Sequence, residues 1–154
     1  MEEQVDISQA EWEIMRIIWT LGPTRTNTLV KILKDKMKWK DSTTKTLLAR
    51  LTKKEFLTPT KEGREFCYAS NITEDEAIDK AAKNLFSNIC AMKVGSSLNR
   101  LIKNTPLSKS DISSLEQLLE NKYQTAPETI SCNCVPLEYQ MDCCAVVKDE
   151  SHEL

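Results

Sequence analysis

Residues 56–69 have the pattern of a β-hairpin, whereas the residues before them have the periodicity of helices. Two short segments, 56–60 and 65–69, flank a Lys61-Glu62-Gly63-Arg64 turn, and Phe66 and Tyr68 alternate onto one face of the second segment. The sequence therefore predicts a mainly α fold with a small β-hairpin.

Three helices are predicted before this hairpin. Ser8 and Glu11 form an S-x-x-E capping box at the start of the first helix, and Leu21-Gly22-Pro23 ends it. Apolar residues follow the box at helical spacing, namely Trp12, Met15 and Trp19. A second helix is predicted from about Thr26.

The third helix is predicted to have Asp41 or Ser42 as its N-cap. The apolar periodicity gives it an inward stripe of Thr44, Leu47, Leu48 and Leu51. Its opposite face is polar and basic. Three helices and a basic hairpin are the components of a winged helix-turn-helix domain, whose third helix enters the major groove of DNA. We expect the DNA contacts to come from Ser42, Thr43, Lys45, Thr46, Arg50, Lys53, Lys61 and Arg64.

The charge distribution agrees with a polyanion as partner. The chain has a net charge of −2, yet residues 31–64 carry 11 basic and 4 acidic residues, a net charge of +7. Residues 1–72 have a net charge of +3 and residues 73–154 a net charge of −5. A basic region on an acidic chain indicates nucleic acid binding. The alternative is a lysine-rich helix face that is merely solvated.

Amphipathic helices are predicted again after the hairpin. Thr73 and Glu76 form a capping box for a long helix that is predicted to continue through Met92, and a shorter helical stretch is predicted around 97–103. A further helix begins at the capping box of Ser108 and Asp111. About 50 residues cannot bury much core alone, so these apolar faces predict a homodimer interface. The alternative is a monomer in which they pack back onto the N-terminal lobe.

Four of the six cysteines lie close together near the C-terminus, at Cys132, Cys134, Cys143 and Cys144. The N-terminal residues are acidic and polar, unlike a signal peptide, so we expect a cytoplasmic protein with reduced thiols. The cluster then indicates a metal site or a redox switch. Four thiolates select Zn(II) or Cu(I). Cys67 and Cys90 are interpreted as small buried hydrophobic residues, and the single histidine, His152, as inert.

The composition argues against several other classes of protein. Three glycines are too few for a phosphate-binding loop, and one histidine leaves no Ser/His or Cys/His pair. We therefore expect no enzymatic activity. No apolar run approaches the roughly 18–20 residues that span a bilayer, so we expect no membrane partner.

Three separated segments resemble the penicillinase/methicillin-resistance repressor family, namely residues 7–15 with Trp19, residues 44–54, and residues 61–68. The resemblance covers roughly residues 5–120 in the same order and spacing. It implies a dimeric winged-helix repressor that binds a palindromic DNA operator.

Two branches of that family differ in the signal they answer. The β-lactam branch is inactivated by cleavage at an Asn-Phe bond; the corresponding pair here is Arg100-Leu101, and no Asn-Phe pair occurs in the sequence. The copper-responsive, CopY-type branch ends in C-x-C-x4-C-x-C. Here Cys132-Asn133-Cys134 is followed by eight residues and then Cys143-Cys144. This resemblance implies that the Zn(II) form represses and that Cu(I) displaces Zn(II) and releases DNA.

The sequence thus predicts a winged-helix DNA-binding domain at 1–72, a helical dimerisation domain at 73–123 and a Cys-rich metal-binding tail at 124–154. The expected function is a transcriptional repressor of a metal (copper) homeostasis operon. One alternative is a β-lactam-type resistance repressor of the same fold, and another is a thiol redox sensor or metal buffer. A metal buffer would not need the polar face of the third helix, so this face argues against that alternative.

Overall fold

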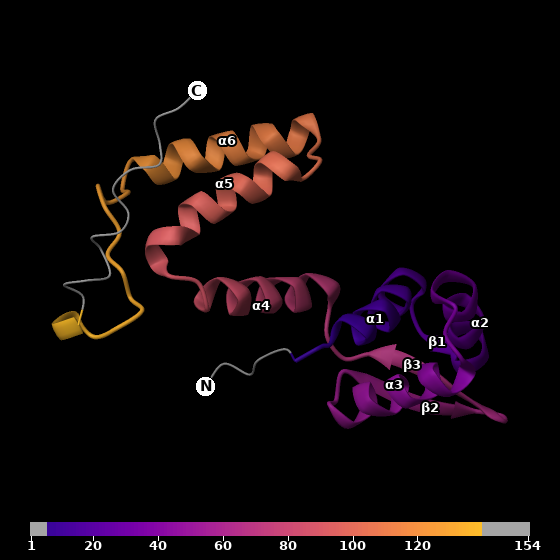
Figure 1. Ribbon diagram of the computed structural model, residues 1–154. Coiled ribbons are helices and arrows are strands. Elements are labelled where there is room, and N and C mark those ends of the chain that lie inside the picture. Colours follow the sequence, from indigo (N-terminus) through magenta and orange to yellow (C-terminus); the bar gives the residue numbers. More distant parts are fainter. Residues whose placement is uncertain (1–5, 140–154) are drawn as a thin grey trace. The chain divides into compact units, whose positions relative to one another are not determined.

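The computed structural model describes residues 6–139 and divides the chain into two compact units, 1–84 and 85–154. The first unit contains α1 (Gln9–Leu21), β1 (Thr24–Arg25), α2 (Thr26–Met37), α3 (Asp41–Lys53), β2 (Leu57–Glu62), β3 (Glu65–Ser70) and most of α4 (Glu74–Ser87), as Figure 1 shows. The second contains the 3₁₀ turn η1 (Ala91–Lys93), α5 (Val94–Asn104), α6 (Lys109–Tyr123) and the 3₁₀ turn η2 (Leu137–Tyr139).

The first unit has the winged helix-turn-helix fold that the sequence predicts, with one additional strand. Its sheet is antiparallel with the order β1-β3-β2, and β1 pairs Thr24 with Tyr68 and Arg25 with Cys67. The sequence did not reveal β1, because two residues are too short for an alternating pattern. Because β1 lies between α1 and α2 in the chain and pairs with β3, it connects the helices to the sheet.

The hairpin turn is tighter than predicted. Lys61 and Glu62 belong to β2, and the loop consists of Gly63 and Arg64 alone. Gly63 has a φ of 66°, a left-handed conformation that glycine adopts without steric cost. Within residues 6–139, β2 pairs only with β3 and is therefore an edge strand, and it contains Pro59.

Local signals fix the first helix as the sequence indicates. Ser8 is the N-cap of α1 and forms the predicted capping box with Glu11. The helix ends at Gly22, whose φ of 78° takes the chain out of the helical conformation. The side chains it buries join those of α2, α3 and β2 in a single core, comprising Ile14, Met15, Ile18, Leu29, Leu33, Leu48, Leu51 and Leu57 among others.

The indole of Trp19 holds the residues that immediately precede α4. Trp19 Nε1 donates hydrogen bonds to the Ile72 carbonyl at 2.9 Å and to Ser70 Oγ at 3.1 Å. Thr73 and Glu76 then form the predicted capping box of α4, with both bonds at 3.2 Å.

α4 ends at Ser87, so the prediction that this helix continues through Met92 was wrong. The amides of Asn88 and Ile89 bond to carbonyls three residues earlier, which tightens the last turn, and Cys90 follows with extended backbone. The apolar periodicity continues across this break, which explains why the sequence alone did not show it.

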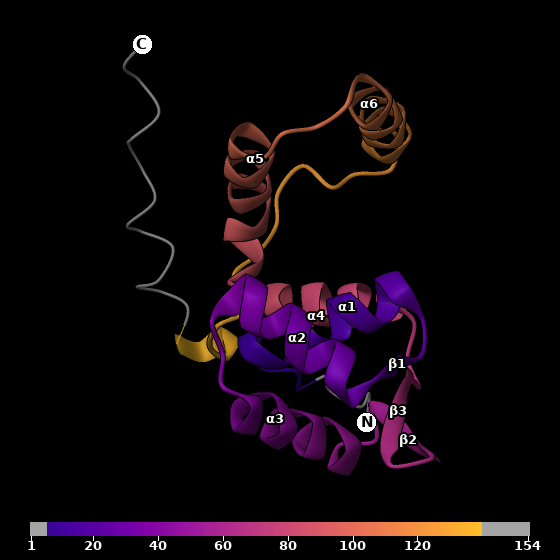
Figure 2. The ribbon, with the colours of Figure 1, turned by 90° about the vertical axis from the view of Figure 1, so that its right-hand side faces the viewer.

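The two helices of the second unit present apolar side chains to solvent in the described part of the chain. Ser108 and Asp111 form the predicted capping box of α6, yet neither α5 nor α6 contains a buried residue. Their leucines are open to solvent, with Leu101 56%, Leu118 60% and Leu119 57% exposed. Figure 2 shows the two helices joined by an extended connection.

Among residues 6–139, no helix combines the length and the apolar character that crossing a membrane requires.

Candidate nucleic-acid interface and metal centre

The outward face of α3 forms an open groove at the surface of the first unit. The groove is lined by Ser42, Thr43, Thr46, Leu47 and Arg50. Apart from Leu47, these side chains are exposed, as is that of Lys45. Thr46 Oγ1 donates to the Ser42 carbonyl at 2.8 Å, so the hydroxyl oxygen keeps its capacity to accept a hydrogen bond. This is the face that the sequence assigned to the reading of base edges.

The inner face of α3 holds the helix against the core. Thr44, Leu47, Leu48 and Leu51 are buried, as the periodicity predicts. The predicted N-cap was wrong: Lys40 is the N-cap and makes no side-chain hydrogen bond there, and Asp41 lies in the first turn. An acidic residue at that position still favours the helix, because it faces the positive end of the helix dipole.

The basic residues expected to contact phosphates lie on α3 and on the hairpin. α3 contacts β2 directly, and Figure 2 shows the hairpin next to the helix. Lys53 is in the last turn of α3, Lys61 is in β2 and Arg64 is in the turn. Together with Lys45 and Arg50 they are exposed, and none of the five forms an ion pair within residues 6–139.

Some other cations of the first unit are neutralised by carboxylates. Arg25 pairs with Glu62 at 3.2 Å, and Lys54 pairs with Glu11 at 2.9 Å. The cations of α3 and the hairpin named above remain available to a polyanion, as do Lys31, Lys34, Lys38 and Lys40 on and just after α2, which form no ion pair within residues 6–139.

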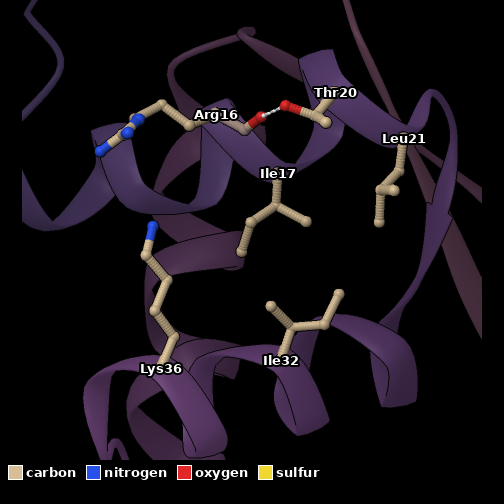
Figure 3. Close-up of a pocket in the computed structure, with 6 residues that line it drawn as sticks. All are labelled: Arg16, Ile17, Thr20, Leu21, Ile32 and Lys36. Carbon is tan, nitrogen blue, oxygen red and sulfur yellow. Dashed lines mark hydrogen bonds between the residues drawn. The ribbon is translucent and has the colours of Figure 1, made fainter.

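A pocket between α1 and α2 has an apolar wall and a basic rim, as Figure 3 shows. Its lining consists of Arg16, Ile17, Thr20, Leu21, Ile32 and Lys36. Both cations pair with one carboxylate, since Glu13 lies 2.7 Å from Lys36 and 3.2 Å from Arg16. The hydrogen bond from Lys36 is the main reason why the pKa of Glu13 is lowered. The pocket therefore offers neither a free charge nor a nucleophile.

The second unit brings together three cysteines that are far apart in the sequence. The sulfur atoms of Cys90, Cys132 and Cys134 all lie within 4.8 Å of one another, and the Sγ atoms of Cys90 and Cys132 are 3.6 Å apart. Cys132 is buried, Cys90 is half-buried and Cys134 is exposed. Cys143 and Cys144 lie outside the described residues.

This cluster fits a soft metal ion by its donor set and by its spacing. Sulfurs bound to one Zn(II) at about 2.3 Å lie about 3.8 Å apart in a tetrahedron, close to the separation of Cys90 and Cys132. Without metal, hydrogen bonds with Cys90 and then with Cys132 raise the pKa of Cys134 to about 12, so its thiol keeps its proton at neutral pH. Binding a metal would release such protons, because only the thiolate is a ligand.

Cys90 is the site residue that the sequence interpretation missed. It was assigned to the interior of an apolar helix, whereas it lies between α4 and η1 and faces Cys132. Nothing in the local sequence distinguishes it from Cys67, which lies on β3 and is not part of the cluster.

Comparison with known proteins gives one family and several relatives. The family described as penicillinase repressor matches residues 7–121. An uncharacterized 16.5 kDa protein in the ptsI 3′ region of Latilactobacillus sakei is 47% identical over 135 residues, covering 88% of this chain and 92% of the relative. The penicillinase repressor of Bacillus licheniformis is 34% identical over 120 residues, covering 78% and 94% of the two chains. The solution structure of the DNA-binding domain of the repressor BlaI is 41% identical, with a TM-score of 0.45, and covers 49% of this chain and 93% of that one.

Proposed function

Since the chain belongs to the penicillinase repressor family, we propose that it is a cytoplasmic, DNA-binding transcriptional repressor that responds to copper and zinc. The observation that carries the metal response is the cluster of Cys90, Cys132 and Cys134. Soft sulfur donors that meet outside a hydrophobic core indicate a metal site more than they indicate packing. The proposed target is the operator of a metal homeostasis operon.

The proposed DNA interface is α3 in the major groove with the wing along the backbone. Thr43, Thr46 and Arg50 are the candidates for base contacts, because they line the exposed groove of α3. Thr46 can accept a hydrogen bond from an amino group of adenine or cytosine. Lys45 lies on the same exposed side of α3 and belongs with these central contacts. Phosphate contacts are assigned to Lys61 and Arg64 on the hairpin, and Ser42 and Lys53 are further exposed candidates near the two ends of α3.

The proposed repressor is a homodimer that binds two half-sites related by a two-fold axis. The support is the exposure of Leu101, Leu118 and Leu119 on helices that contain no buried residue in the described part of the chain. A second copy of the chain provides the cover that these apolar faces lack. Residues 1–72, 73–123 and 124–154 keep the proposed roles of DNA binding, dimerisation and metal binding.

The metal response follows from the number of sulfur donors. A structural Zn(II) site takes four donors, whereas Cu(I) is satisfied by fewer thiolates. Cys132 and Cys134, with Cys143 and Cys144, would hold either Zn(II) or Cu(I). The two ions then favour different arrangements of one segment, which gives the chain a means of coupling metal identity to operator affinity. We propose that the Zn(II) form binds the operator and that the Cu(I) form releases it.

Two other functions remain as competing hypotheses. A β-lactam-type repressor would be cut near Arg100 and Leu101, but these residues lie inside α5 and the sequence has no Asn-Phe bond. A thiol redox sensor is favoured by one observation, the 3.6 Å separation of the sulfurs of Cys90 and Cys132. The cytoplasmic setting favours metal over a stable disulfide.

An operator gel shift tests this proposal. The operator is first selected from random duplexes with the reduced, Zn(II)-loaded protein, and Cu(I) is then added under anaerobic conditions. We expect Cu(I) to release the DNA, and release by an oxidant alone would instead support the redox sensor. Release by neither agent would refute both sensing functions and leave a repressor of the β-lactam type.

A further inference from the structure

We propose that Cys90 is a ligand of the metal site. A metal ion bound by Cys90, Cys132 and Cys134 would cross-link residues 132–134 to the turn between α4 and α5. This inference rests on the proposed metal response, and it extends the ligand set beyond the cysteines of the C-terminal tail. It makes the junction of α4 and α5 part of the sensor.

The backbone places Cys90 where its sulfur can serve as a ligand. α4 ends at Ser87, two turn residues follow, and Cys90 precedes η1 with φ −51° and ψ 130°. Its carbonyl accepts a hydrogen bond from the Lys93 amide at 2.8 Å, which holds the local conformation. The side chain is half-buried, so the thiol is neither enclosed in a core nor fully solvated.

The three sulfurs already have the spacing that one metal ion requires. Those of Cys90 and Cys132 are 3.6 Å apart, and that of Cys134 lies within 4.8 Å of both. Sulfurs around a single Zn(II) are about 3.8 Å apart, so only small movements separate this arrangement from a coordinated one.

Two hydrogen bonds join the Cys132–Cys134 segment to Cys90 and its neighbour, and a third lies within the segment. The Sγ atom of Cys90 donates to that of Cys132 at 3.6 Å. The Ala91 amide, next to Cys90, donates to Asn133 Oδ1 at 2.9 Å. The Cys134 amide donates to the sulfur of Cys132 at 3.5 Å. Together these bonds orient the three sulfur atoms relative to one another. Asn133, which separates the two cysteines, is thus a positioning residue.

The number of donors gives the two metals different requirements. Cys90, Cys132 and Cys134 supply three thiolates, which is sufficient for Cu(I) but one short of a tetrahedral Zn(II) site. Cu(I) binding should therefore survive the loss of Cys143 and Cys144, provided that Cys90 is present.

The test uses the full-length protein with Cys143→Ser and Cys144→Ser, which leaves these three thiols and Cys67. We expect this protein to bind Cu(I) in competition with a chelator of known affinity. Adding Cys90→Ser should weaken the binding by at least about tenfold, the equivalent of about 1.4 kcal/mol. Adding Cys67→Ser instead is the matched control, because Cys67 lies outside the cluster, and it should change the affinity by less than about twofold.

A second measurement uses the unmodified protein, so it does not depend on how the variants fold. Reduced protein is alkylated with and without Cu(I), and the modified cysteines are identified by mass spectrometry. We expect Cu(I) to protect Cys90, Cys132 and Cys134 and to leave the reaction of Cys67 unchanged.

Three results would overturn this inference. They are equal Cu(I) affinity with and without Cys90, alkylation of Cys90 at the same rate in the presence of Cu(I), and a Cys90–Cys132 disulfide in protein kept anaerobic. If the unmodified protein binds metal normally and only the Cys90 results fail, the proposed function stands. If the unmodified protein binds neither Cu(I) nor Zn(II), the proposed function fails as well.

Discussion

Lys54 Nζ lies 2.9 Å from Glu11 Oε2, and this contact joins the residue after α3 to the first turn of α1. Glu11 is buried and also accepts the backbone N–H of Ser8, so a single carboxylate caps α1 and binds the end of α3. Lys54 donates to the Asp6 carbonyl at 2.7 Å as well. The orientation of α3, and with it the proposed DNA-reading face, therefore depends on an electrostatic contact with α1.

Replacing Lys54 by Met should destabilise the fold at neutral pH. It leaves the buried carboxylate of Glu11 without its cation, and hydrogen bonds to charged groups contribute about 1.5–3 kcal/mol. We expect a loss of that size in the free energy of unfolding, measured by urea denaturation at fixed protein concentration. Lys53→Met is the matched control, since Lys53 is exposed and unpaired within residues 6–139, and it should change stability by less than about 0.5 kcal/mol.

The same carboxylate should make stability depend on pH. Burial raises the pKa of Glu11, but the Ser8 amide and Lys54 outweigh it, and the net pKa is below the ordinary 4.5. A lowered pKa stabilises the fold above about pH 4.5, and this contribution is lost as the pH falls through the folded-state value. The stability advantage of the unmodified protein over Glu11→Gln should therefore shrink between pH 6 and pH 3. A constant difference over that range would contradict the assignment.

Arg50→Ala and Thr46→Ala should reduce both operator affinity and base selectivity. Each side chain lines the groove of α3, and loss of a base contact costs about 1–3 kcal/mol. Fluorescence anisotropy with the selected operator and with single-base variants measures both effects. If every duplex lost affinity equally, these residues would be phosphate contacts and the direct-readout assignment would be wrong.

Lys61→Ala should weaken binding to all duplexes alike. Lys61 is an exposed, unpaired residue of β2 in the described part of the chain, so its expected partner is a phosphate. Removing one phosphate contact should lower the slope of log affinity against log salt concentration by about one. A titration from low to moderate salt checks this, and an unchanged slope would place Lys61 away from the DNA.

Leu118→Glu with Leu119→Glu should convert the proposed dimer into a monomer. Both leucines are more than half exposed in one chain, and a dimer would have to bury two new charges in their place. Sedimentation velocity at micromolar concentration should show dimer for the unmodified protein and monomer for the variant. Gln117→Glu adds a charge to the same helix and serves as the control. An unmodified protein that sediments as a monomer would refute the dimer.

Cys143→Ser should weaken Zn(II) binding more than Cu(I) binding. Zn(II) needs four donors to close a structural site, whereas Cu(I) tolerates fewer. Competition titrations with chelators of known affinity give both constants. Replacing Cys132, Cys134, Cys143 and Cys144 together by Ser should abolish the copper response in a gel shift. If the tail acts only as a brake on DNA binding, this variant should still bind the operator. Full copper-induced release from that variant would locate the sensing site elsewhere in the chain.

Local sequence signals predicted most of the first unit because each one acts over a few residues. The capping boxes at Ser8, Thr73 and Ser108 all form, and the inward stripe of α3 is buried as its periodicity indicates. Two features were not predictable, and only the first of them depends on a distant partner. β1 exists only because Thr24 and Arg25 pair with β3. Lys40 rather than Asp41 or Ser42 is the N-cap of α3, although nothing in the sequence marks it as one.

The candidate metal site was likewise only partly predictable from the sequence. The C-terminal cysteines were predictable from ligand type and spacing alone. Cys90 was not, because 42 positions separate it from Cys132 and only the folded chain brings the two sulfurs together. The unbroken apolar periodicity through Ile89 and Met92 concealed the end of α4, and with it the half-buried position of Cys90 outside any helix.

Pro59 lies on the free edge of the sheet, and its position affects the tendency of the protein to aggregate at high concentration. In the described part of the chain β2 has a partner strand on one side only, and an open edge of this kind can recruit a strand from another molecule. Proline lacks the amide hydrogen that such pairing requires, and Lys61 and Glu62 add charge to the same edge. Wings of neighbouring molecules are thereby kept from joining into a continuous sheet. Copies of the chain crowded on adjacent DNA sites can thus approach one another without aggregating through the surface that is proposed to contact the DNA backbone.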